Sequence, residues 1–407
     1  MIVSFCFEFY YIRYGGIMFI LLIAVLYLAF IGLGLPDTVL GSAWPSMFEE
    51  MNVPVSFAGI ISPIISIGTI ISSLMSDRIT LKLGSGKTTF ISIFMTAAAL
   101  LGFSLSTEFW MLCLFAIPFG LGAGSVDAAL NNYVALHYSS KHMSWLHCMW
   151  GVGASIGPAI MSFALTSGRG WSKGYLYISI IQFVICFIVL ISLPLWKNRI
   201  EKKEENDNKD RKPVSFFKVL SMGGAKPLLL SFFCYCALEV VIILWASTYL
   251  HLDRGIDAEI AAAWASLYVL GITVGRAING FASMKLSDTT LIRIGFVICT
   301  VGMIMIILPI SNTVSLVGLV VAGLGSAPIY PCIIHSTPIR FGADKSQAII
   351  GMQMASAYTG SCLMPPLFGL IANHISISLF PFYAGAILIT MIISHEYLCY
   401  KFPLKTN

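Results

Sequence analysis

Long apolar segments recur along the whole chain, separated by short turns that contain charged residues, glycine or proline. A helix needs about 20 apolar residues to cross the hydrocarbon core of a bilayer. Twelve segments reach this length. They cover residues 17–46, 55–76, 88–106, 109–137, 143–166, 173–196, 227–251, 258–284, 289–310, 313–337, 344–372 and 376–400. The pattern predicts an all-α membrane protein with twelve transmembrane helices.

One long polar stretch, residues 197–213, separates the first six apolar segments from the last six. Its dense mixed charge can neither enter a membrane nor form a core, so we expect a solvated linker. The apolar run begins at Met18, which suggests Met18 as an alternative start to Met1. The expected organisation is an amino-terminal extension (1–16), a six-helix bundle (17–196), a cytoplasmic linker (197–226), a second six-helix bundle (227–400) and a cytoplasmic tail (401–407).

Composition excludes a soluble fold, because 57% of the residues are hydrophobic and only 11% are charged, against about 25% charged in soluble domains. The ten cysteines are scattered and contain no CxxC pair, so they are interpreted as small packing residues. The sequence contains no HExxH metal site and no P-loop. We therefore expect no cofactor, no bound metal and no nucleic-acid partner.

Basic residues indicate the orientation of the chain in the membrane, because cytoplasmic loops are enriched in Lys and Arg. With both termini placed in the cytoplasm, 20 of the 24 Lys and Arg residues fall on the cytoplasmic side. Arg169, Lys173 and Arg254 fall on the opposite side, and Arg276 lies inside a span. This asymmetry predicts a multi-pass protein of the cell membrane with both termini in the cytoplasm.

The two halves contain a weak internal repeat. Gly124-Ser125 in the fourth span corresponds to Gly325-Ser326 in the tenth, and a Gly/Pro-rich helix follows in each half. Internal repeats are common in transporters, which move one bundle against the other. Close helix packing is the alternative explanation for each individual glycine.

The loop after the second span reads SSLMSDRITLKLGSGK, and the eighth span contains a Gly-Arg pair that ends at Arg276. With Asp77, Arg78 and the following basic residues, this loop resembles the G-x-x-x-D-R signature of the major facilitator superfamily, with Ser73 in place of the usual glycine. The resemblance extends from about Met18 to Lys401. It implies two pseudo-symmetric six-helix bundles and a cytoplasmic conformational latch formed by Asp77, Arg78 and Arg276. Positive-inside topology explains the lysines of this loop but not Asp77.

Five further stretches are similar to the fucose permease-like group of sugar transporters within that superfamily. They are GLPDTVLGSAWPSM (34–47), DAALNN (127–132), the Tyr235, Glu239, Trp245, Tyr249, Leu250 pattern, GSAPIYPCIIHSTPIRFG (325–342) and YTGSCLMPPLFG (358–369). By this resemblance Asp37 and Asp127 match the two membrane carboxyl positions used for proton coupling and sugar recognition. The group typically has Glu where this chain has Asp127.

The residues themselves also indicate function. Asp37, Asp127 and Glu239 lie deep inside predicted spans, where loss of hydration disfavours the charged form of a carboxyl group. Ionisable residues in such positions are functional by default, and purely structural hydrogen bonding is the alternative. We predict that these three residues couple transport to protons.

A polar and aromatic pocket is expected around these acids. Asp127 and Asn131 are four residues apart and share a helix face, as do Tyr235 and Glu239. The predicted substrate-binding residues are Asp37, Asp127, Asn131, His147, Trp150, Tyr235, Glu239, Trp245, Tyr330, Gln353 and Tyr358. For His147 and the aromatic residues, packing is the competing interpretation, and Arg276 either pairs with a carboxylate or caps a loop.

These features favour a monomeric secondary transporter that takes up a sugar or similar polyol together with protons. The GVGASIGP stretch is similar to a motif of drug antiporters and supports an alternative, proton-driven efflux of amphipathic compounds. A membrane-embedded enzyme or a sensor is a third, different class of function.

Overall fold

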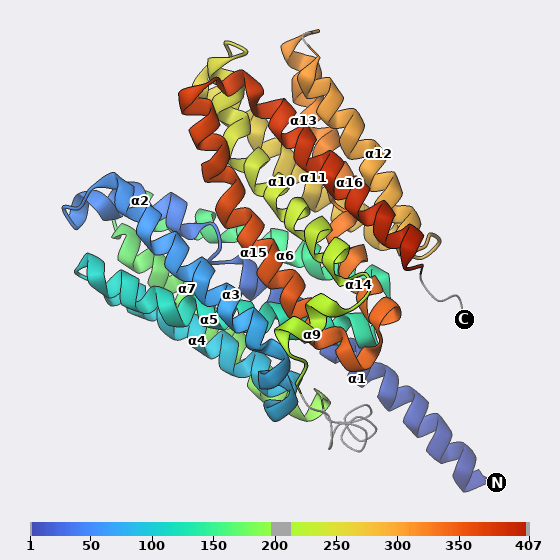
Figure 1. Ribbon diagram of the computed structural model, residues 1–407. Coiled ribbons are helices and arrows are strands. Elements are labelled where there is room, and N and C mark those ends of the chain that lie inside the picture. The colour runs from blue at the N-terminus through green and yellow to red at the C-terminus, as the bar shows by residue number, and fades with distance from the viewer. Residues whose placement is uncertain (1, 197–212, 309, 404–407) are drawn as a thin grey trace.

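The computed structural model describes residues 2–196, 213–308 and 310–403. These residues form α-helices and two short 3₁₀ helices, and no β-strand occurs among them. Figure 1 shows two groups of helices, one from each half of the chain, that diverge in the upper left of the view.

The first half of the chain forms seven α-helices and one 3₁₀ helix. They are α1 (Ile2–Gly34), α2 (Val39–Glu50), η1 (Val55–Phe57), α3 (Ala58–Leu83), α4 (Ser85–Leu105), α5 (Phe109–His137), α6 (Ser140–Thr166) and α7 (Gly170–Trp196). The segments α1 and α2 belong to a single membrane span that is interrupted by a turn at residues 35–38.

The described residues after the gap begin with α9, a short helix within the predicted linker, and continue with the second half of the chain. The elements are α9 (Phe216–Ser221), α10 (Ala225–Leu252), α11 (Ala258–Ala282), α12 (Asp288–Ile307), α13 (Asn312–Ser326), α14 (Ile329–Phe341), α15 (Ala343–His374), η2 (Ile377–Leu379) and α16 (Phe380–Lys401). The segments α13 and α14 again form one interrupted span. Residues 197–212, which contain most of the predicted linker, lie outside the described residues.

Eleven helical segments of the described chain are long and apolar enough to cross a membrane. The one predicted span missing from these eleven, residues 344–372, corresponds to α15, which has 32 residues but contains Ser346, Gln347 and Gln353 among its buried residues. Because α15 packs against α3, α5 and α10, protein rather than lipid covers these polar side chains. The predicted fold of twelve helices in two six-helix bundles is confirmed.

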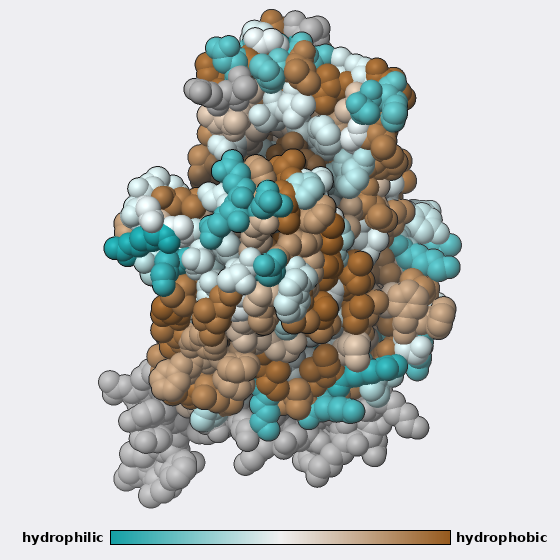
Figure 2. Space-filling model, turned by 90° about the vertical axis from the view of Figure 1, so that its left-hand side faces the viewer, coloured by the Kyte–Doolittle hydropathy of each residue, from teal (hydrophilic) through white to brown (hydrophobic). Residues whose placement is uncertain are grey.

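The outer surface of the bundles is apolar. Large side chains such as Ile67, Phe187 and Phe281 are exposed, and Figure 2 shows broad hydrophobic areas on the face that it presents. An apolar surface of this extent is costly in water. It is the surface that a lipid bilayer covers.

The two halves contact each other near the linker. We call this end of the molecule the linker side, defined by Trp196 at the end of α7 and Phe216 at the start of α9. Here α3 packs against α15, α6 against α11, and α5 against α14. Away from the linker side the halves diverge (Figure 1), and the surface is hollowed between them (Figure 2).

Glycines permit the close packing of helices within each half. A Cβ atom at Gly157 would lie 1.9 Å from the carbonyl oxygen of Leu35, and one at Gly325 would lie 2.2 Å from the backbone nitrogen of Cys299. Both separations are far inside van der Waals contact. Helix packing therefore accounts for glycines of the repeat and of the GVGASIGP stretch.

Candidate functional site

Asp37 lies at the interruption of the first membrane span, between α1 and α2. The turn is fixed by the Thr38 hydroxyl, which donates to the carbonyl oxygen of Ala154 on α6 over 2.8 Å. Asp37 is exposed, and its Oδ2 accepts a hydrogen bond of 2.8 Å from the indole Nε1 of Trp150. The interrupted helix thus presents a carboxylate to solvent within the span, and interrupted helices commonly form transporter binding sites.

Asp127 lies on α5 and accepts hydrogen bonds from both halves of the molecule. The amide Nδ2 of Asn131 donates to its Oδ1 over 2.7 Å, and the hydroxyl of Tyr358 on α15 donates to its Oδ2 over 3.1 Å. His147 Nε2 lies 3.0 Å from Asn131 Oδ1, which can only accept. His147 therefore donates to Asn131, and Asn131 in turn donates to the Asp127 carboxylate.

Arg276 on α11 reaches across the contact between the halves. Its Nη1 donates to the carbonyl oxygen of His147 and its Nη2 to the hydroxyl of Tyr235, both over 3.4 Å. Its Nη2 lies 3.7 Å from Glu239 Oε1, and the guanidinium carbon lies 5.5 Å from the centre of the Trp150 ring. Nε of Arg276 is buried without a hydrogen-bond partner among the described residues.

These contacts join eight of the predicted residues into one group, which we call the central cluster: Asp37, Asp127, Asn131, His147, Trp150, Tyr235, Glu239 and Tyr358. Arg276 belongs to the same group by its contacts. The cluster combines three carboxylates with one guanidinium, and both halves contribute to it. The hydroxyl groups of a small polar solute can donate to the carboxylates of the cluster and accept from its N–H and O–H groups.

Aromatic rings surround the buried side of the cluster. The ring of Tyr330 lies 4.6 Å from that of His147, 4.6 Å from that of Phe232 and 5.6 Å from that of Tyr235. Phe30 contacts His147 edge-on at 5.2 Å. Phe30 and Phe232 are not among the predicted site residues, because an apolar ring inside a span has no sequence signal that separates it from packing.

Two predicted binding residues make their polar contacts outside the cluster. Trp245 donates from Nε1 to the carbonyl oxygen of Pro365 over 3.0 Å and packs edge-on against Phe368. Gln353 is fully buried, and its Oε1 accepts a hydrogen bond of 3.0 Å from Thr337. The structure places these two residues within the second half of the chain.

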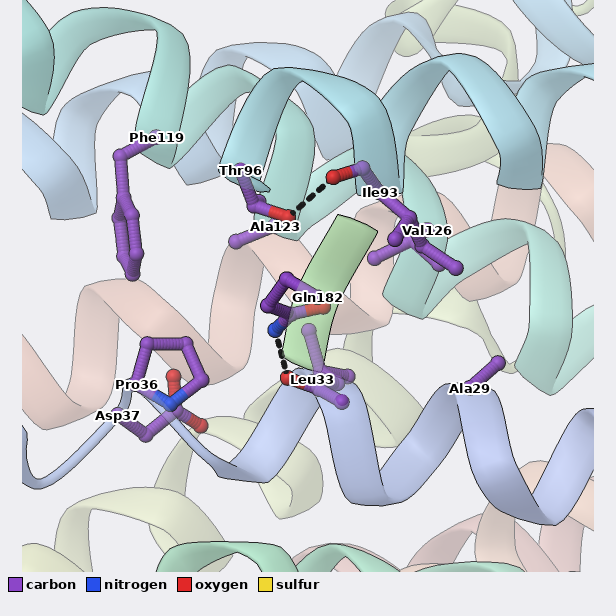
Figure 3. Close-up of a pocket in the computed structure, with 11 residues that line it drawn as sticks. Ala29, Leu33, Pro36, Asp37, Ile93, Thr96, Phe119, Ala123, Val126 and Gln182 are labelled. Atoms are coloured by element: carbon purple, nitrogen blue, oxygen red, sulfur yellow. Dashed lines mark hydrogen bonds between the residues drawn. The ribbon is translucent and has the colours of Figure 1, made fainter. Parts of the chain in front are cut away.

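A small cavity adjoins Asp37 inside the first half (Figure 3). It is lined by Ala29, Gly32, Leu33, Pro36, Asp37, Ile93, Thr96, Phe119, Ala123, Val126 and Gln182. Gln182 donates from Nε2 to the carbonyl oxygen of Gly32. Its buried Oε1 has no partner among the described residues, so an acceptor is left at the wall of this cavity.

The predicted latch residues lie in different places. Asp77 is buried near the end of α3, and its Oδ2 accepts a hydrogen bond of 3.0 Å from the backbone N–H of Val214 at the end of the linker. Arg78 beside it is exposed. Arg276, in contrast, has its contacts in the central cluster.

A second set of polar contacts joins the halves on the linker side. Ser140 donates to Asp288 Oδ1 over 2.5 Å, and Asp288 Oδ2 lies 2.6 Å from His335 Nδ1. None of these residues is among the predicted site residues. His335 is an ionisable residue inside a predicted span, and this signal would have identified it.

The sequence also contains a G-x-S-x-G pattern at residues 153–157. Ser155 lies inside α6 and donates to the carbonyl oxygen of Gly151 over 2.9 Å. A nucleophilic serine elbow requires a sharp turn between a strand and a helix. The pattern in this chain is part of a continuous helix.

Several known transporters are similar to this chain in sequence or in structure. The glucose/mannose transporter GlcP of Bacillus subtilis is 24% identical over 362 residues, which cover 87% of this chain and 88% of GlcP. FucP, described as a fucose:proton symporter of E. coli, aligns in its outward conformation with a TM-score of 0.74 and 15% identity, over 93% of this chain and 99% of FucP. The proton:xylose symporter XylE aligns with a TM-score of 0.78 and 13% identity, over 94% and 96% of the two chains.

The family profile described as Major Facilitator Superfamily matches residues 26–365. This match covers parts of both halves and every residue of the central cluster. The chain belongs to the Major Facilitator Superfamily, whose members are multi-pass membrane transporters and not enzymes.

Proposed function

We propose that this protein takes up a sugar or similar small polar solute together with protons, by alternating access. The central cluster carries this proposal. Both halves contribute to it, and Tyr358 and Arg276 reach residues of the first half through hydrogen bonds. Separation of the halves on the linker side would therefore change the contacts of Asp127 and of Arg276 directly.

The chemistry of the cluster fits a polyol better than an apolar solute. Asp37 and Asp127 provide acceptors, while the groups around them that can donate hydrogen bonds include Trp150, Tyr358 and Arg276. Sugars present several hydroxyl groups that donate and accept at fixed spacings, and their C–H faces pack on aromatic rings. Half-buried Trp150 and Tyr358 are accessible for such contacts.

The three carboxyl groups support proton coupling. A carboxylate inside a membrane protein is costly unless it is paired, hydrated or protonated. Glu239 has a cationic neighbour in Arg276 at 3.7 Å, whereas Asp37 and Asp127 accept hydrogen bonds from neutral donors. Asp37 and Asp127 are thus the residues that we propose to bind and release protons during the cycle.

Two of the similar proteins are described as sugar transporters, which supports this proposal. GlcP is described as a glucose/mannose transporter, and XylE as a proton:xylose symporter. We further propose that the chain lies in the cell membrane as a monomer with both termini and the linker in the cytoplasm. In this orientation the linker side is cytoplasmic, and Asp77 and Arg78 act as its latch.

Uptake by purified protein in proteoliposomes tests the proposal. Internal and external pH are clamped separately, and glucose, mannose, xylose, fucose and uncharged polyols are supplied in turn. We expect at least one of them to accumulate above its external concentration when the exterior is acidic, and not when the proton gradient is collapsed. Failure to accumulate any of them under an imposed gradient would contradict the proposal.

A further inference from the structure

The polar contacts on the linker side involve residues that the central cluster does not use. Asp288 begins α12, and its carboxylate lies between Ser140 of α6 at 2.5 Å and His335 of α14 at 2.6 Å. The other ring nitrogen of His335, Nε2, lies 3.2 Å from the carbonyl oxygen of Tyr138. Asp288 and His335 belong to the second half, whereas Tyr138 and Ser140 belong to the first. The group therefore joins the halves twice.

The hydrogen bonds of His335 require one proton more than a neutral imidazole and an ionised Asp288 carboxylate carry together. Both ring nitrogens of His335 face acceptors, namely a carboxylate oxygen and a carbonyl oxygen. A neutral imidazole carries one N–H only. Either neutral tautomer would leave a nitrogen lone pair against an oxygen lone pair, at 2.6 Å or at 3.2 Å. One additional proton, shared by His335 and Asp288, satisfies both contacts.

The helix ends around the group favour a charged pair, with the proton on the imidazole. Asp288 lies in the first turn of α12, and Ser140 is the first residue of α6. Both helix N-termini favour negative charge at the Asp288 carboxylate. Tyr138 follows the last residue of α5, and the carbonyl end of a helix favours a cation such as protonated His335.

Other titratable groups on the neighbouring helices have partners elsewhere. On α5 and α6, His137 bonds to the Tyr133 carbonyl oxygen, His142 to the Tyr27 hydroxyl, and Lys141 lies over the Trp145 ring.

The titratable groups of the second half also have partners. On α12 and α16, Arg293 pairs with Glu396, and Arg340 of α14 bonds to the Phe402 carbonyl oxygen. On α15, Asp344 pairs with Lys345, and on α10, Glu239 pairs with Arg276. The Cys332 thiol lies 4.0 Å from Ser140 Oγ.

We propose that Asp288 and His335 form a second proton-binding site, separate from the central cluster, whose proton holds the two halves together on the linker side. The pair is nearly buried, with side-chain exposures of 10% and 16%, so water from the linker side can still reach it. When the halves separate, Ser140 and Tyr138 move away and both residues become hydrated. A hydrated histidine is neutral above about pH 6.5, so opening at neutral pH releases the proton toward the linker side.

The sign of the pH effect follows from this release. Protons bind to the closed form, so low pH stabilises closure and high pH favours opening on the linker side. One proton released per opening event changes the ratio of open to closed molecules by up to about ten-fold per pH unit. The inference concerns the closure of the halves and holds whatever solute is transported.

Distance measurements between spin labels on the two halves test the inference without any solute. Labels are placed at Lys82 at the end of α3 and Lys285 after α11, two exposed positions on the linker side. They are attached through unnatural amino acids, so that Cys332 and the other native cysteines remain. Between pH 5.5 and 7.5, we expect the ratio of open to closed molecules to rise at least ten-fold in the unmodified sequence.

Asp288→Asn is the decisive variant. An asparagine at this position donates to neutral His335 through its amide nitrogen and accepts from Ser140 through its oxygen. His335 still donates to Tyr138. We therefore expect the halves to remain closed, with less than a two-fold change in the ratio over the same pH range. His335→Ala removes the contact to Tyr138, and we expect it to be open across the range.

Glu396→Gln is the matched control, because it removes another linker-side carboxylate, one whose pairing with Arg293 stays within the second half. We expect its pH response to equal that of the unmodified sequence. A pH response that is unchanged in Asp288→Asn, or absent from the unmodified sequence, would overturn the inference. Loss of sugar uptake with a normal pH response of the distances would contradict the proposed function alone.

Discussion

The indole Nε1 of Trp150 donates a hydrogen bond of 2.8 Å to the Asp37 carboxylate, across 113 positions of the chain. The same indole lies beside the guanidinium of Arg276, with 5.5 Å between the ring centre and the guanidinium carbon. Trp150 thus connects the exposed carboxylate of the first half to the buried cation of the second. Its two contacts can be separated by substitution.

Trp150→Phe should retain a ring beside Arg276 but remove the donor to Asp37. Because Asp37 is one of the residues that we propose to bind the solute, loss of the donor that positions its carboxylate should raise the KM for the solute roughly ten-fold, which corresponds to about 1.4 kcal/mol of binding free energy. Initial uptake rates over a range of solute concentrations measure this effect. Trp245→Phe serves as the control, because Trp245 bonds within the second half, and its KM should change less than that of Trp150→Phe.

Asp127→Asn should abolish accumulation against a gradient while leaving exchange of solute across the membrane. The neutral amide can accept from Asn131 and donate to the Tyr358 hydroxyl, so the cluster should keep its shape. It cannot bind or release a proton. Concentrative uptake and solute counterflow in proteoliposomes separate the two activities.

Asp344→Asn is the control for this charge removal, because that side chain is 65% exposed at the start of α15. Its accumulation should equal that of the unmodified protein. Full concentrative uptake by Asp127→Asn would remove this residue from the coupling mechanism.

Removal of one partner of the Arg276 and Glu239 pair should destabilise the protein more than removal of both. Glu239 is 13% exposed and Arg276 is 4% exposed, and an uncompensated buried charge costs about 3–5 kcal/mol. Arg276→Gln should therefore lower the melting temperature, and adding Glu239→Gln should restore part of it. Thermal unfolding of the purified variants in detergent measures both, and additive losses would show that the two charges do not interact.

Gly351 should control the closure of the linker side. A Cβ atom at this position on α15 would lie 2.4 Å from the carbonyl oxygen of Ser73 on α3. Gly351→Val should act as a wedge between the halves and increase the open population, seen as a longer distance between labels at positions 82 and 285. Gly385→Ala, where a Cβ would meet no atom within 4 Å, should leave that distance unchanged.

Gly157 should matter for stability through its contact with the turn that follows α1. Overpacking a tight core costs about 1–3 kcal/mol, and the Cβ of Gly157→Ala would lie 1.9 Å from the Leu35 carbonyl oxygen. We expect a lower melting temperature for this variant. Gly59→Ala, with open space around its Cβ, should unfold at the temperature of the unmodified protein, and equal losses in both variants would contradict the packing argument.

The lengths of the apolar segments determine the number and approximate limits of the spans, because each helix must satisfy its own backbone and match the bilayer. These requirements are local, so the spans can be predicted from the sequence. The intramembrane acids can also be predicted from the sequence, because a carboxyl group is rare within an apolar run. Asp37, Asp127 and Glu239 are identified in this way, whereas their role in binding a solute stays a prediction.

Partnerships between distant residues were decided only by the tertiary structure. For Arg276 the sequence leaves a latch, a pair with a carboxylate and a loop cap open, and in the structure its contacts are with Glu239, Tyr235 and His147. Trp245 and Gln353 have theirs within the second half. The pairing of Asp288 and His335, and their contacts across the halves, had no counterpart in the sequence pattern. Each of these outcomes depends on how a helix is rotated about its axis and which neighbour it meets. Successive residues of a helix differ by about 100° in direction, so a small rotation exchanges one partner for another without changing the apolar length that the sequence encodes.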